Sequence, residues 1–276
     1  HLLNKKIKKV FPQIILNINK EELTIVKKEK VIYRILSFIE GKFLSESKHS
    51  YKLFSNFGKI LGQINKELLK LEDEAIESRK IEWDIKNLNW NRKYLEYIED
   101  VETKKLVEYF LLQFNENVFP NDCNLRRSII HNDANDWNIL VNKDNIIGVI
   151  DFGDMVKTYM INEVAIALSY ILIEKEDIMK WIIKFLKPYN KSIKLKSIEI
   201  DLLYYLIPAR LCTTILKSSF HEKEDPSDKY ITISKKGATD LLKKWITINP
   251  VLLQDRIKKE LNISIKKRAS NLDLIK

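Results

Sequence analysis

The chain has 276 residues, 45% hydrophobic and 31% charged, which is the composition of a globular protein with one large domain or two small ones. The net charge of +10 comes mainly from lysine, because only eight of the 48 basic residues are arginine. Surfaces that bind nucleic acids tend to be clustered and rich in arginine, so this scattered charge predicts no nucleic-acid partner.

Cysteine usage and apolar runs indicate a cytoplasmic protein. Cys123 and Cys212 lie far apart in the sequence, which favours neither a disulfide framework nor a zinc site. The longest apolar run, Val164 to Ile173, is shorter than the roughly 20 residues of a membrane-spanning helix, so we expect no membrane partner. No signal peptide is evident. The chain begins at His1 rather than Met, which suggests a truncated or processed polypeptide.

The first forty residues predict the end of a helix and then short strands. Residues 1–10 form the end of an amphipathic helix, which Phe11-Pro12 terminates. Residues 14–18 and 23–26 are predicted to pair as a hairpin, because the polar residues between them favour a turn. Residues 33–39 form a third predicted strand.

Helices are predicted next. Residues 51–71 carry apolar side chains at close to a helical period, so they form an amphipathic helix packed on the core. Asp84, after Trp83, is placed to cap the N-terminus of a helix. Residues 93–117 form another helix, and a loop at 119–122 follows it.

One stretch carries the chemistry. Ile139–Val141 and Ile146–Ile150 are apolar runs joined by four turn-favouring residues, which predicts a β-hairpin. In an antiparallel hairpin the start of the first strand lies beside the end of the second, with paired α-carbons roughly 4.5–5.5 Å apart. Asn138 and Asp151 flank these two points, and Asp133 lies on the loop that enters the same end. The three side chains are therefore expected to converge.

These oxygen donors suit Mg²⁺, which keeps several waters and is usually completed by substrate phosphates. Asn138 and Asp151 would make such a half-open metal site. Asp133 is then left to accept or orient the proton of an attacking hydroxyl, while His131 braces the loop. This arrangement predicts phosphoryl transfer, in which catalysis is mostly positioning and charge neutralisation.

The last third of the chain is predicted to be helical. Residues 162–174 form a buried helix, and Glu163 near its start would be costly to bury unpaired. Arg210, on the apolar helix 201–216, is its natural partner, so we expect a structural Glu163–Arg210 pair behind the hairpin. Residues 221–228 are predicted to form an acidic loop. The segment 237–261 is helical with a break at Asn249-Pro250, and residues after Ser264 form a lysine-rich end.

The pattern His131-x-Asp133-x-x-x-x-Asn138, followed by Asp151-Phe152-Gly153-Asp154, resembles the catalytic core of the aminoglycoside phosphotransferase and choline kinase superfamily. Asn162-Glu163-Val-Ala-Ile-Ala167 and Pro208-Ala-Arg210-Leu-Cys212 are similar to its hydroxylysine kinase-like branch, some members of which are fused to class III aminotransferases. The resemblance runs from about residue 10 to residue 260.

The resemblance implies a protein-kinase-like α+β fold with two lobes. Residues 1–40 would be a shortened β lobe with the hinge, and residues 41–276 a mainly helical C-terminal lobe that carries the catalytic hairpin. The implied activity is Mg²⁺-dependent transfer of the γ-phosphate of ATP or GTP to a hydroxyl of an amine-bearing alcohol or a hydroxylated amino acid. An aminotransferase domain or partner in the same pathway is also implied.

The resemblance further implies site residues. Asp133 would be the base and His131 the organiser of its loop, with Asn138 and Asp151 as metal ligands. Main-chain groups at the hinge, Ser37, Phe38 and Ile39, would hold the nucleotide base, with a plain edge strand as the alternative. Three carboxylates are candidates to contact the substrate or support the site: Asp84, Asp136 and Asp154.

Two departures from the family pattern leave an alternative open. Asn132 stands where glycine is commonest, a change that the backbone tolerates because Asn adopts left-handed angles. The phosphate-covering loop, strand lysine and helix glutamate of kinase-like folds are not identifiable, so the alternative is an impaired pseudokinase or a small-molecule-binding module. A protein kinase is disfavoured, because its loop has Arg where Asn132 stands and no Ala-Pro-Glu stretch follows Asp154.

Overall fold

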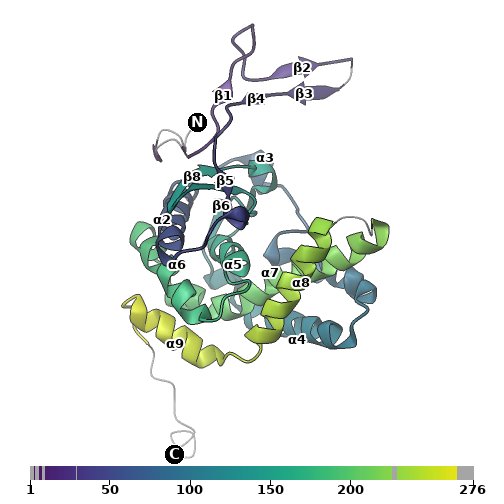
Figure 1. Ribbon diagram of the computed structural model, residues 1–276, viewed down its shortest axis with the longest axis vertical. Helices are drawn as coiled ribbons and strands as arrows, with labels where there is room; N and C mark the ends of the chain where they lie inside the picture. The colour runs from purple at the N-terminus through teal and green to yellow at the C-terminus, as the bar shows by residue number, and fades with distance from the viewer. Residues whose placement is uncertain (1–2, 4–5, 8–9, 29, 226–228, 266–276) are drawn as a thin grey trace, which may run out of the picture.

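The computed structural model describes the chain except for residues 1–2, 4–5, 8–9, 29, 226–228 and 266–276. A mainly helical body carries a narrow β arm, residues 14–36, that projects away from it (Figure 1). The predicted helix end at residues 1–10 lies largely outside the described residues. Within the described part Leu3 and Lys6 are helical, and the Ile7 amide donates to the Leu3 carbonyl at 2.7 Å.

The arm is made of four short strands in two pairs. Strand β1 (Ile14–Ile15) pairs with β4 (Ile35–Leu36), and β2 (Thr24–Val26) pairs with β3 (Val31–Tyr33), all antiparallel. The predicted pairing of residues 14–18 with 23–26 is therefore wrong. The polar residues between them close a loop on themselves instead, because the Asn17 side chain accepts hydrogen bonds from the amides of Asn19 and Glu21, both at 2.9 Å.

The arm enters and leaves the body beside the predicted hairpin. Val10 and Phe11 are buried, and the Val149 amide donates to the Val10 carbonyl at 2.7 Å. On the return, strand β5 (Lys42–Phe43) pairs with the first strand of the hairpin and starts the chain through the body, followed by the 3₁₀ turn η1 (Leu44–Glu46). The N-terminal segment is thus attached to both hairpin strands.

The predicted hairpin is confirmed. Strands β7 (Ile139–Asn142) and β8 (Asn145–Val149) pair antiparallel, and with β5 they make a three-stranded sheet. Lys143 takes a positive φ of 55° in the turn. At the open end the Ile150 amide donates to the Asn138 carbonyl at 3.0 Å, so Asn138 and Asp151 are brought to the same end as expected.

A second, two-stranded sheet frames the loops. Strand β6 (Arg127–Ile130) leads into the loop 131–138, and β9 (Val156–Tyr159) follows the 3₁₀ turn η4 (Phe152–Asp154); the two strands pair antiparallel. Both loops therefore leave the same end of this sheet.

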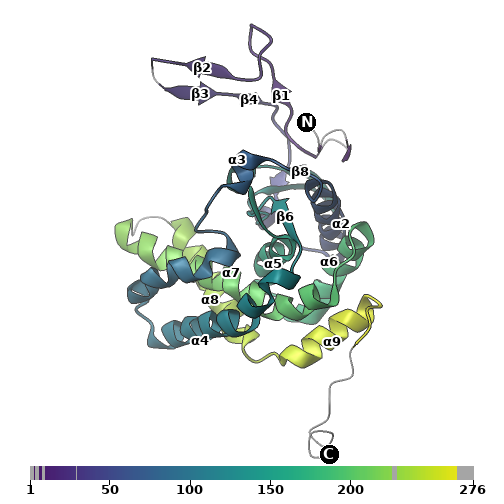
Figure 2. The same ribbon diagram turned by 180° about the vertical axis from the view of Figure 1, so that it is seen from behind.

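Helices on one side of the sheets are closely packed (Figures 1 and 2). Helix α2 (Tyr51–Leu68), capped by Ser50, and the buried α5 (Met160–Ile171) confirm two predicted helices. Helix α6 (Ile178–Ser192) lies against α2 at Gly58, where a Cβ would stand 2.1 Å from the Phe185 carbonyl oxygen. This contact is possible only without a side chain at that position.

The rest of the body consists of η2 (Ile85–Tyr97), α4 (Val101–Asn117), η3 (Phe119–Asn124), α7 (Ser197–Glu224), α8 (Lys229–Trp245) and α9 (Pro250–Glu260), with the short α3 (Glu74–Glu77) near the arm (Figure 1). The single helix predicted over 93–117 is wrong, because the Asp100 side chain accepts from the Thr103 amide at 2.9 Å and starts a new helix. The break predicted at Asn249-Pro250 is confirmed, with Asn249 as the cap of α9.

The acidic loop predicted over 221–228 is wrong for its first half, since residues 221–224 complete α7; residues 226–228 and the chain end from 266 lie outside the described residues. Among the helices that the structure describes, none is long and apolar enough to cross a membrane.

Candidate active site

The loop 131–138, called here the catalytic loop, is turned by Asn132. This residue has a φ of 67°, in the left-handed region, and its side chain is fully buried. Asn adopts such angles at low cost, so the replacement of the family's glycine is accommodated. The turn places the amides of His131 and Asn132 side by side, pointing into the body.

Glu163, at the start of α5, receives those amides. Its Oε2 accepts from the His131 amide at 2.6 Å and from the Asn132 amide at 3.4 Å. Complete burial raises the pKa of Glu163. The predicted ion pair with Arg210 is wrong, because the carboxylate binds loop backbone instead and Arg210 points elsewhere. The two residues still contact the same loop, from different sides.

His131 joins the loop to the hairpin. The Asp133 amide can only donate, so at 3.2 Å the His131 Nδ1 is the acceptor, and the proton lies on Nε2, which donates to the Ile150 carbonyl at 2.8 Å. The ring also packs 4.6 Å from the Phe152 ring, which in turn contacts Phe11 at 5.6 Å. The imidazole is thus fixed in one tautomer between loop, hairpin and N-terminal segment.

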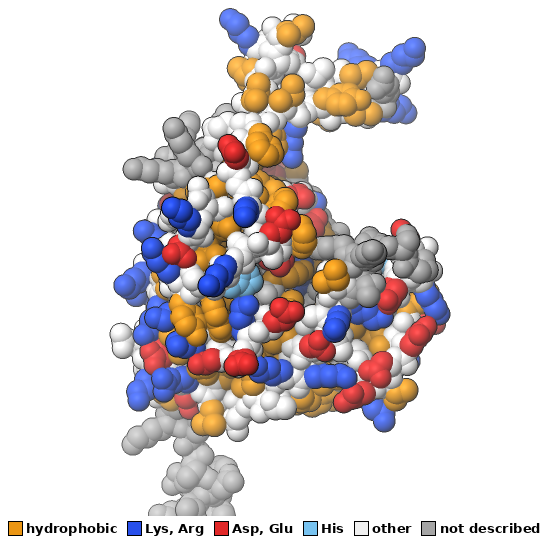
Figure 3. Space-filling model, viewed as in Figure 1, with side chains coloured by type: hydrophobic (Ala, Val, Ile, Leu, Met, Phe, Trp, Pro, Cys, Tyr) orange, Lys and Arg blue, Asp and Glu red, His pale blue; other side chains and the backbone are white. Residues whose placement is uncertain are grey.

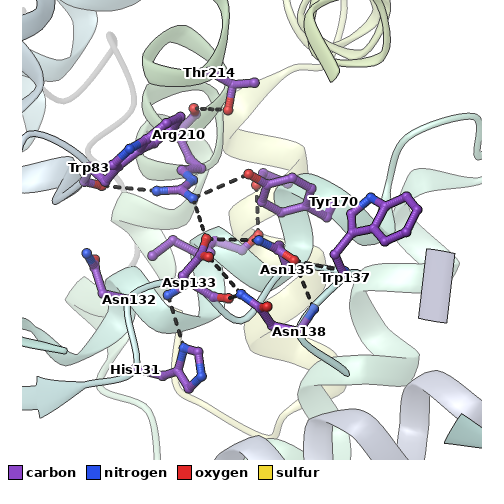
Figure 4. Close-up of polar contacts among 12 residues, drawn as sticks. Trp83, His131, Asn132, Asp133, Asn135, Trp137, Asn138, Tyr170, Arg210 and Thr214 are labelled. Carbon is purple, nitrogen blue, oxygen red and sulfur yellow. Dashed lines mark hydrogen bonds and ion pairs between the residues drawn. The ribbon is translucent and has the colours of Figure 1, made fainter. Parts of the chain in front are cut away.

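The Asp133 carboxylate is held by three donors. Its Oδ1 accepts from Arg210 Nη2 and Asn135 Nδ2, both at 3.0 Å, and its Oδ2 accepts from Asn138 Nδ2 at 2.7 Å (Figure 4). A carboxylate offers about four lone-pair directions, so one direction at Oδ2 remains. Burial raises the pKa of Asp133, while the charge of Arg210 acts in the opposite direction.

Arg210, on α7, is the partner of Asp133 that the sequence interpretation missed. It is 1% exposed and also donates to the Trp83 carbonyl at 3.0 Å and to the Tyr170 hydroxyl at 3.3 Å. Its guanidinium carbon lies 4.8 Å from the centroid of the Trp83 ring. The signal in the sequence was an arginine in an apolar helix, but nothing local indicated which of two buried acids it would meet.

Asn138 and Asp151 lie at the mouth of the hairpin. The Asn138 amide nitrogen is committed to Asp133, which leaves its oxygen as the donor atom for a cation. Asp151 is exposed, has a left-handed φ of 57°, and accepts from the Gly153 amide at 3.0 Å through Oδ1. Arg79 clamps this turn by donating to the carbonyls of Gly153 and Met155, both at 2.7 Å.

This pair fits a magnesium ion better than a transition metal. Within the described residues no group of three or more His, Cys, Asp or Glu side chains is arranged to hold a metal. One amide oxygen and one carboxylate are a suitable set of protein ligands for Mg²⁺, because that ion keeps waters and phosphate oxygens in its coordination sphere.

Asp84 has a structural position. It is 3% exposed, its Oδ1 accepts from the Lys86 amide at 3.0 Å, and the Thr158 hydroxyl donates to it at 2.8 Å. The predicted helix cap is confirmed. The proposed contact with substrate is corrected, since the carboxylate is enclosed between η2, β9 and α5.

The hinge segment lies at the base of the arm. The Ser37 amide donates to the Gln13 carbonyl at 2.8 Å, and its hydroxyl accepts from the Gln13 amide at 2.9 Å, while the Phe38 side chain is 90% exposed. Ile39 is partly buried. No contact described here joins these residues to the catalytic loop, and a nucleotide contact by Ser37, Phe38 and Ile39 stays a prediction.

The two remaining candidate carboxylates flank Asp133. Asp154 is partly buried, and its negative charge raises the pKa of both Asp133 and Arg210. Asp136 is also partly buried, and burial, with the nearby charge of Asp133, raises its pKa to about 6. Both carboxylates stay predictions as substrate-contacting or supporting groups.

The chain is similar in sequence to known proteins. Residues 10–188 match the profile of a family described as "Phosphotransferase enzyme family". Hydroxylysine kinase of Xenopus laevis is 27% identical over 223 residues, covering 75% of this chain and 60% of that protein. The chain thus spans about 60% of the length of the curated relative that it matches.

Solved structures show the same fold. A microcompartment-associated aminopropanol kinase has a TM-score of 0.68 at 15% identity, covering 89% of this chain and 78% of that chain. The amicoumacin kinase hAmiN, solved with AMP-PNP, Ca²⁺ and its ligand Ami, has a TM-score of 0.62 at 14% identity, covering 86% and 73%. The predicted kinase-like α+β fold is confirmed, with small β-sheets and a mostly helical C-terminal part.

Proposed function

Because the chain belongs to the phosphotransferase enzyme family, we propose that it transfers the γ-phosphate of ATP or GTP to a hydroxyl of an amino alcohol or a hydroxylated amino acid. This is a small-molecule kinase activity that depends on Mg²⁺. The division of the chain into a β part, residues 1–40, and a helical catalytic part, residues 41–276, belongs to the same proposal.

The observation that carries the proposal is the hydrogen bonding of Asp133. Three donors fix its carboxylate, and the remaining direction at Oδ2 is where a substrate hydroxyl would donate. An alcohol that donates there has its oxygen oriented for attack on the γ-phosphorus. Asp133 receives the proton as the new O–P bond forms, while the bond from the γ-phosphorus to the bridging oxygen breaks and ADP or GDP leaves. Positioning of this kind supplies most of the catalysis in phosphoryl transfer.

Asn138 and Asp151 would hold the metal. When bound, Mg²⁺ neutralises the charge of the transferred phosphate group. The residues of this chain then have separate tasks: His131 keeps the loop against the hairpin through Ile150, and the Arg79 clamp keeps the Asp151 turn closed. A nucleotide that binds at the open end of the hairpin would contact the side-chain oxygens of Asn138 and Asp151, next to the Asp133 carboxylate.

The substrate class is suggested by the names of similar proteins. Hydroxylysine and aminopropanol each combine an amine with a hydroxyl. The negative charges of Asp136 and Asp154 both act on Asp133. These two carboxylates would favour a positively charged acceptor over a neutral or anionic one. The acceptor is therefore proposed as an amine-bearing alcohol.

The first test is calorimetric binding of ATP and of GTP, each with and without MgCl₂. We expect metal-dependent binding that Asp151→Ala weakens about tenfold or more, equivalent to about 1.4 kcal/mol. Glu108→Gln, which removes an exposed charge from α4, is the control and should bind like the parent chain.

The second test is turnover with hydroxylysine and 1-amino-2-propanol. Asp133→Asn should lower kcat by about 10²- to 10⁴-fold while it leaves Mg²⁺–nucleotide binding intact. Equal turnover in the Asp133→Asn variant would refute the assignment of the base. Nucleotide binding without turnover in the parent chain would instead support the impaired-kinase alternative.

A further inference from the structure

Two packed helices of the body, α2 and α6, expose only lysine side chains. The exposed residues of α2 are seven positions apart, close to two helical turns, and so lie on one side of that helix: Lys52, Lys59 and Lys66. The exposed residues of α6 are Lys180, Lys184, Lys187 and Lys191. α6 contains no acidic residue, and Glu67 of α2 is partly buried. These seven lysines are called here the lysine face.

The two rows of lysines run side by side. Ser55 donates to the Lys184 carbonyl at 3.0 Å, and Ser192 donates to the Lys59 carbonyl at 3.3 Å. Both hydrogen bonds thus join main-chain groups of the lysine-bearing turns, and their order shows that α2 and α6 run in the same direction. Figure 3 shows Lys and Arg side chains gathered on the side of the body where α2 and α6 lie in Figure 1. The row on α2 is about 21 Å long.

Most of this charge is not neutralised within the chain. Lys52 lies 3.5 Å from Asp144, and Lys187 lies 2.7 Å from Glu260. The other five lysines of the face form no ion pair with any residue that the structure describes: Lys59, Lys66, Lys180, Lys184 and Lys191. Like charges held together on one surface produce a positive potential, which attracts an anionic partner.

The composition of the lysine face distinguishes between kinds of anionic partner. Interfaces between proteins are depleted in lysine. Nucleic-acid recognition favours arginine, whose planar guanidinium pairs with phosphates through two hydrogen bonds. Lysine carries a compact, strongly hydrated charge, and clusters of about four to eight basic residues are typical of surfaces that bind anionic lipids. A lysine-only face therefore fits a bilayer better than the two alternatives.

Binding at a bilayer surface requires no membrane-spanning segment. The expectation of no membrane partner was based on the shortness of the apolar runs, which concerns insertion into the bilayer and not attraction to its headgroups. Since every exposed residue of α2 and α6 is lysine, these helices offer no apolar side chain for insertion. The attraction would then be electrostatic and reversible.

We propose that the lysine face binds an anionic lipid surface, with the bilayer contacting the rows on α2 and α6 together. The inference is independent of the proposed kinase function, because none of the seven lysines belongs to the candidate active site. An extended nucleic-acid duplex is the competing partner, and the experiment includes it.

The test is co-sedimentation of the full chain with phosphatidylcholine vesicles that contain either no phosphatidylserine or about 30 mol% of it. We expect binding to the anionic vesicles alone. Raising NaCl from about 50 to about 500 mM should reduce that binding at least about tenfold, because salt screens the attraction.

Four substitutions together test the face: Lys59→Gln, Lys66→Gln, Lys184→Gln and Lys191→Gln. Each lysine near a bilayer contributes a factor of about five, so this variant should bind at least about 50-fold more weakly than the parent. The matched control has the same net charge but replaces four exposed lysines outside both helices: Lys80→Gln, Lys105→Gln, Lys223→Gln and Lys236→Gln. It should bind within about threefold of the parent, because the attraction falls off within a Debye length.

Absence of vesicle binding by the parent chain would overturn the proposal, and so would equal losses in the face variant and the control. If the fourfold variant does not fold, the paired substitutions on α2 and on α6 are measured separately, and each should reduce binding about 25-fold. Anisotropy of a labelled RNA duplex is measured in parallel. Duplex binding that is lost in the face variant, without vesicle binding by the parent, would assign the face to nucleic acid instead.

Discussion

Arg210 determines the geometry of the site at the scale of single residues. It is buried, and it contacts a carboxylate, a main-chain carbonyl, a hydroxyl and an aromatic face. A planar guanidinium is suited to such a set, because its donors point in fixed directions while its face stacks. We interpret Arg210 as a positioning residue, which acts on the reaction through Asp133.

Replacing this guanidinium should harm both stability and the orientation of the base. We expect Arg210→Met to lower the free energy of unfolding by about 3 kcal/mol, because it leaves the partly buried Asp133 carboxylate without its ion-pair partner. It should also reduce kcat about tenfold or more with little change in KM for nucleotide. Denaturant titration and steady-state kinetics measure the two effects.

One further variant separates the positioning role of Arg210 from its charge, and a second variant is the control. Arg210→Lys keeps the charge but not the fork, so partial recovery of stability without recovery of kcat would support positioning. Arg256→Met removes an exposed ion pair with Glu260 and should change stability by less than about 1 kcal/mol. If kcat in Arg210→Met stays at the parent value, the positioning role is wrong.

The residues of the site were predictable to different degrees. Spacing placed Asn138 and Asp151 at one end of a hairpin, because an antiparallel turn brings those positions together whatever the tertiary structure. The partners of Glu163 and Arg210 could not be assigned in this way. Each is a long-range contact, and either buried acid was a chemically acceptable partner for the arginine.

At the scale of elements, two prolines inside helices show how packing compensates for local defects. Pro208 in α7 has no amide hydrogen to donate to the Tyr204 carbonyl, and the Trp245 indole donates to that carbonyl at 2.9 Å instead. Pro188 in α6 leaves the Lys184 carbonyl in the same position, and Ser55 donates to it at 3.0 Å. Neighbouring helices therefore replace the missing hydrogen bonds.

The close contact of α2 with α6 predicts that adding one methyl group at Gly58 lowers the stability of the protein. Alanine is a better helix former than glycine by about 1 kcal/mol, yet Gly58→Ala should destabilise the protein by about 2 kcal/mol. The reason is that the new Cβ would stand 2.1 Å from the Phe185 carbonyl oxygen, which is backbone and must shift. Thermal or denaturant unfolding measures the change.

Lys66→Ala, at an exposed position of the same helix, is the matched control and should change stability by less than about 0.5 kcal/mol. A Gly58→Ala variant as stable as the control would mean that α6 moves away freely.

Element prediction succeeded where a pattern was local. The helical spacing of apolar residues in α2 and the helix break at Asn249-Pro250 can both be recognised from a short stretch of sequence. It failed in the arm, where four short strands of similar composition allow several pairings, and at Asp100, whose capping role divides what is otherwise a continuous apolar period. In both places the choice depends on contacts outside the segment.

At the scale of the whole molecule, the arm contrasts with the body. Its hydrophobic side chains are well exposed: Ile15, Leu16, Ile18, Leu23, Ile25, Val31, Ile32, Tyr33, Ile35 and Leu36 are all between 38% and 100% accessible. Figure 3 shows hydrophobic groups on the projecting arm. Two-stranded ribbons have little stability of their own, and large exposed apolar patches promote association.

Polar substitutions on the arm should therefore reduce self-association without weakening the body. Ile25 and Ile32 face each other across β2 and β3 and are each 62% exposed, so Ile25→Glu with Ile32→Lys replaces an apolar pair by an ion pair. We expect less concentration-dependent light scattering and an unchanged midpoint of thermal unfolding.

Leu252→Lys on α9 is the control, since that side chain is 69% exposed but lies apart from the arm, and it should change scattering little. A lowered midpoint in the arm variant would show that the arm stabilises the body.

The three donors around Asp133 also determine how far the chain could be shortened without losing a contact of this carboxylate. Asn135 and Asn138 come from the loop itself, whereas Arg210 reaches Asp133 across 77 residues of chain and Trp83 across 127. A fragment that ended before α7 would contain every position of the family's catalytic pattern and yet lack Arg210, which donates to Asp133, the proposed base. The pattern is short, but we expect the smallest active unit to include most of the helical body.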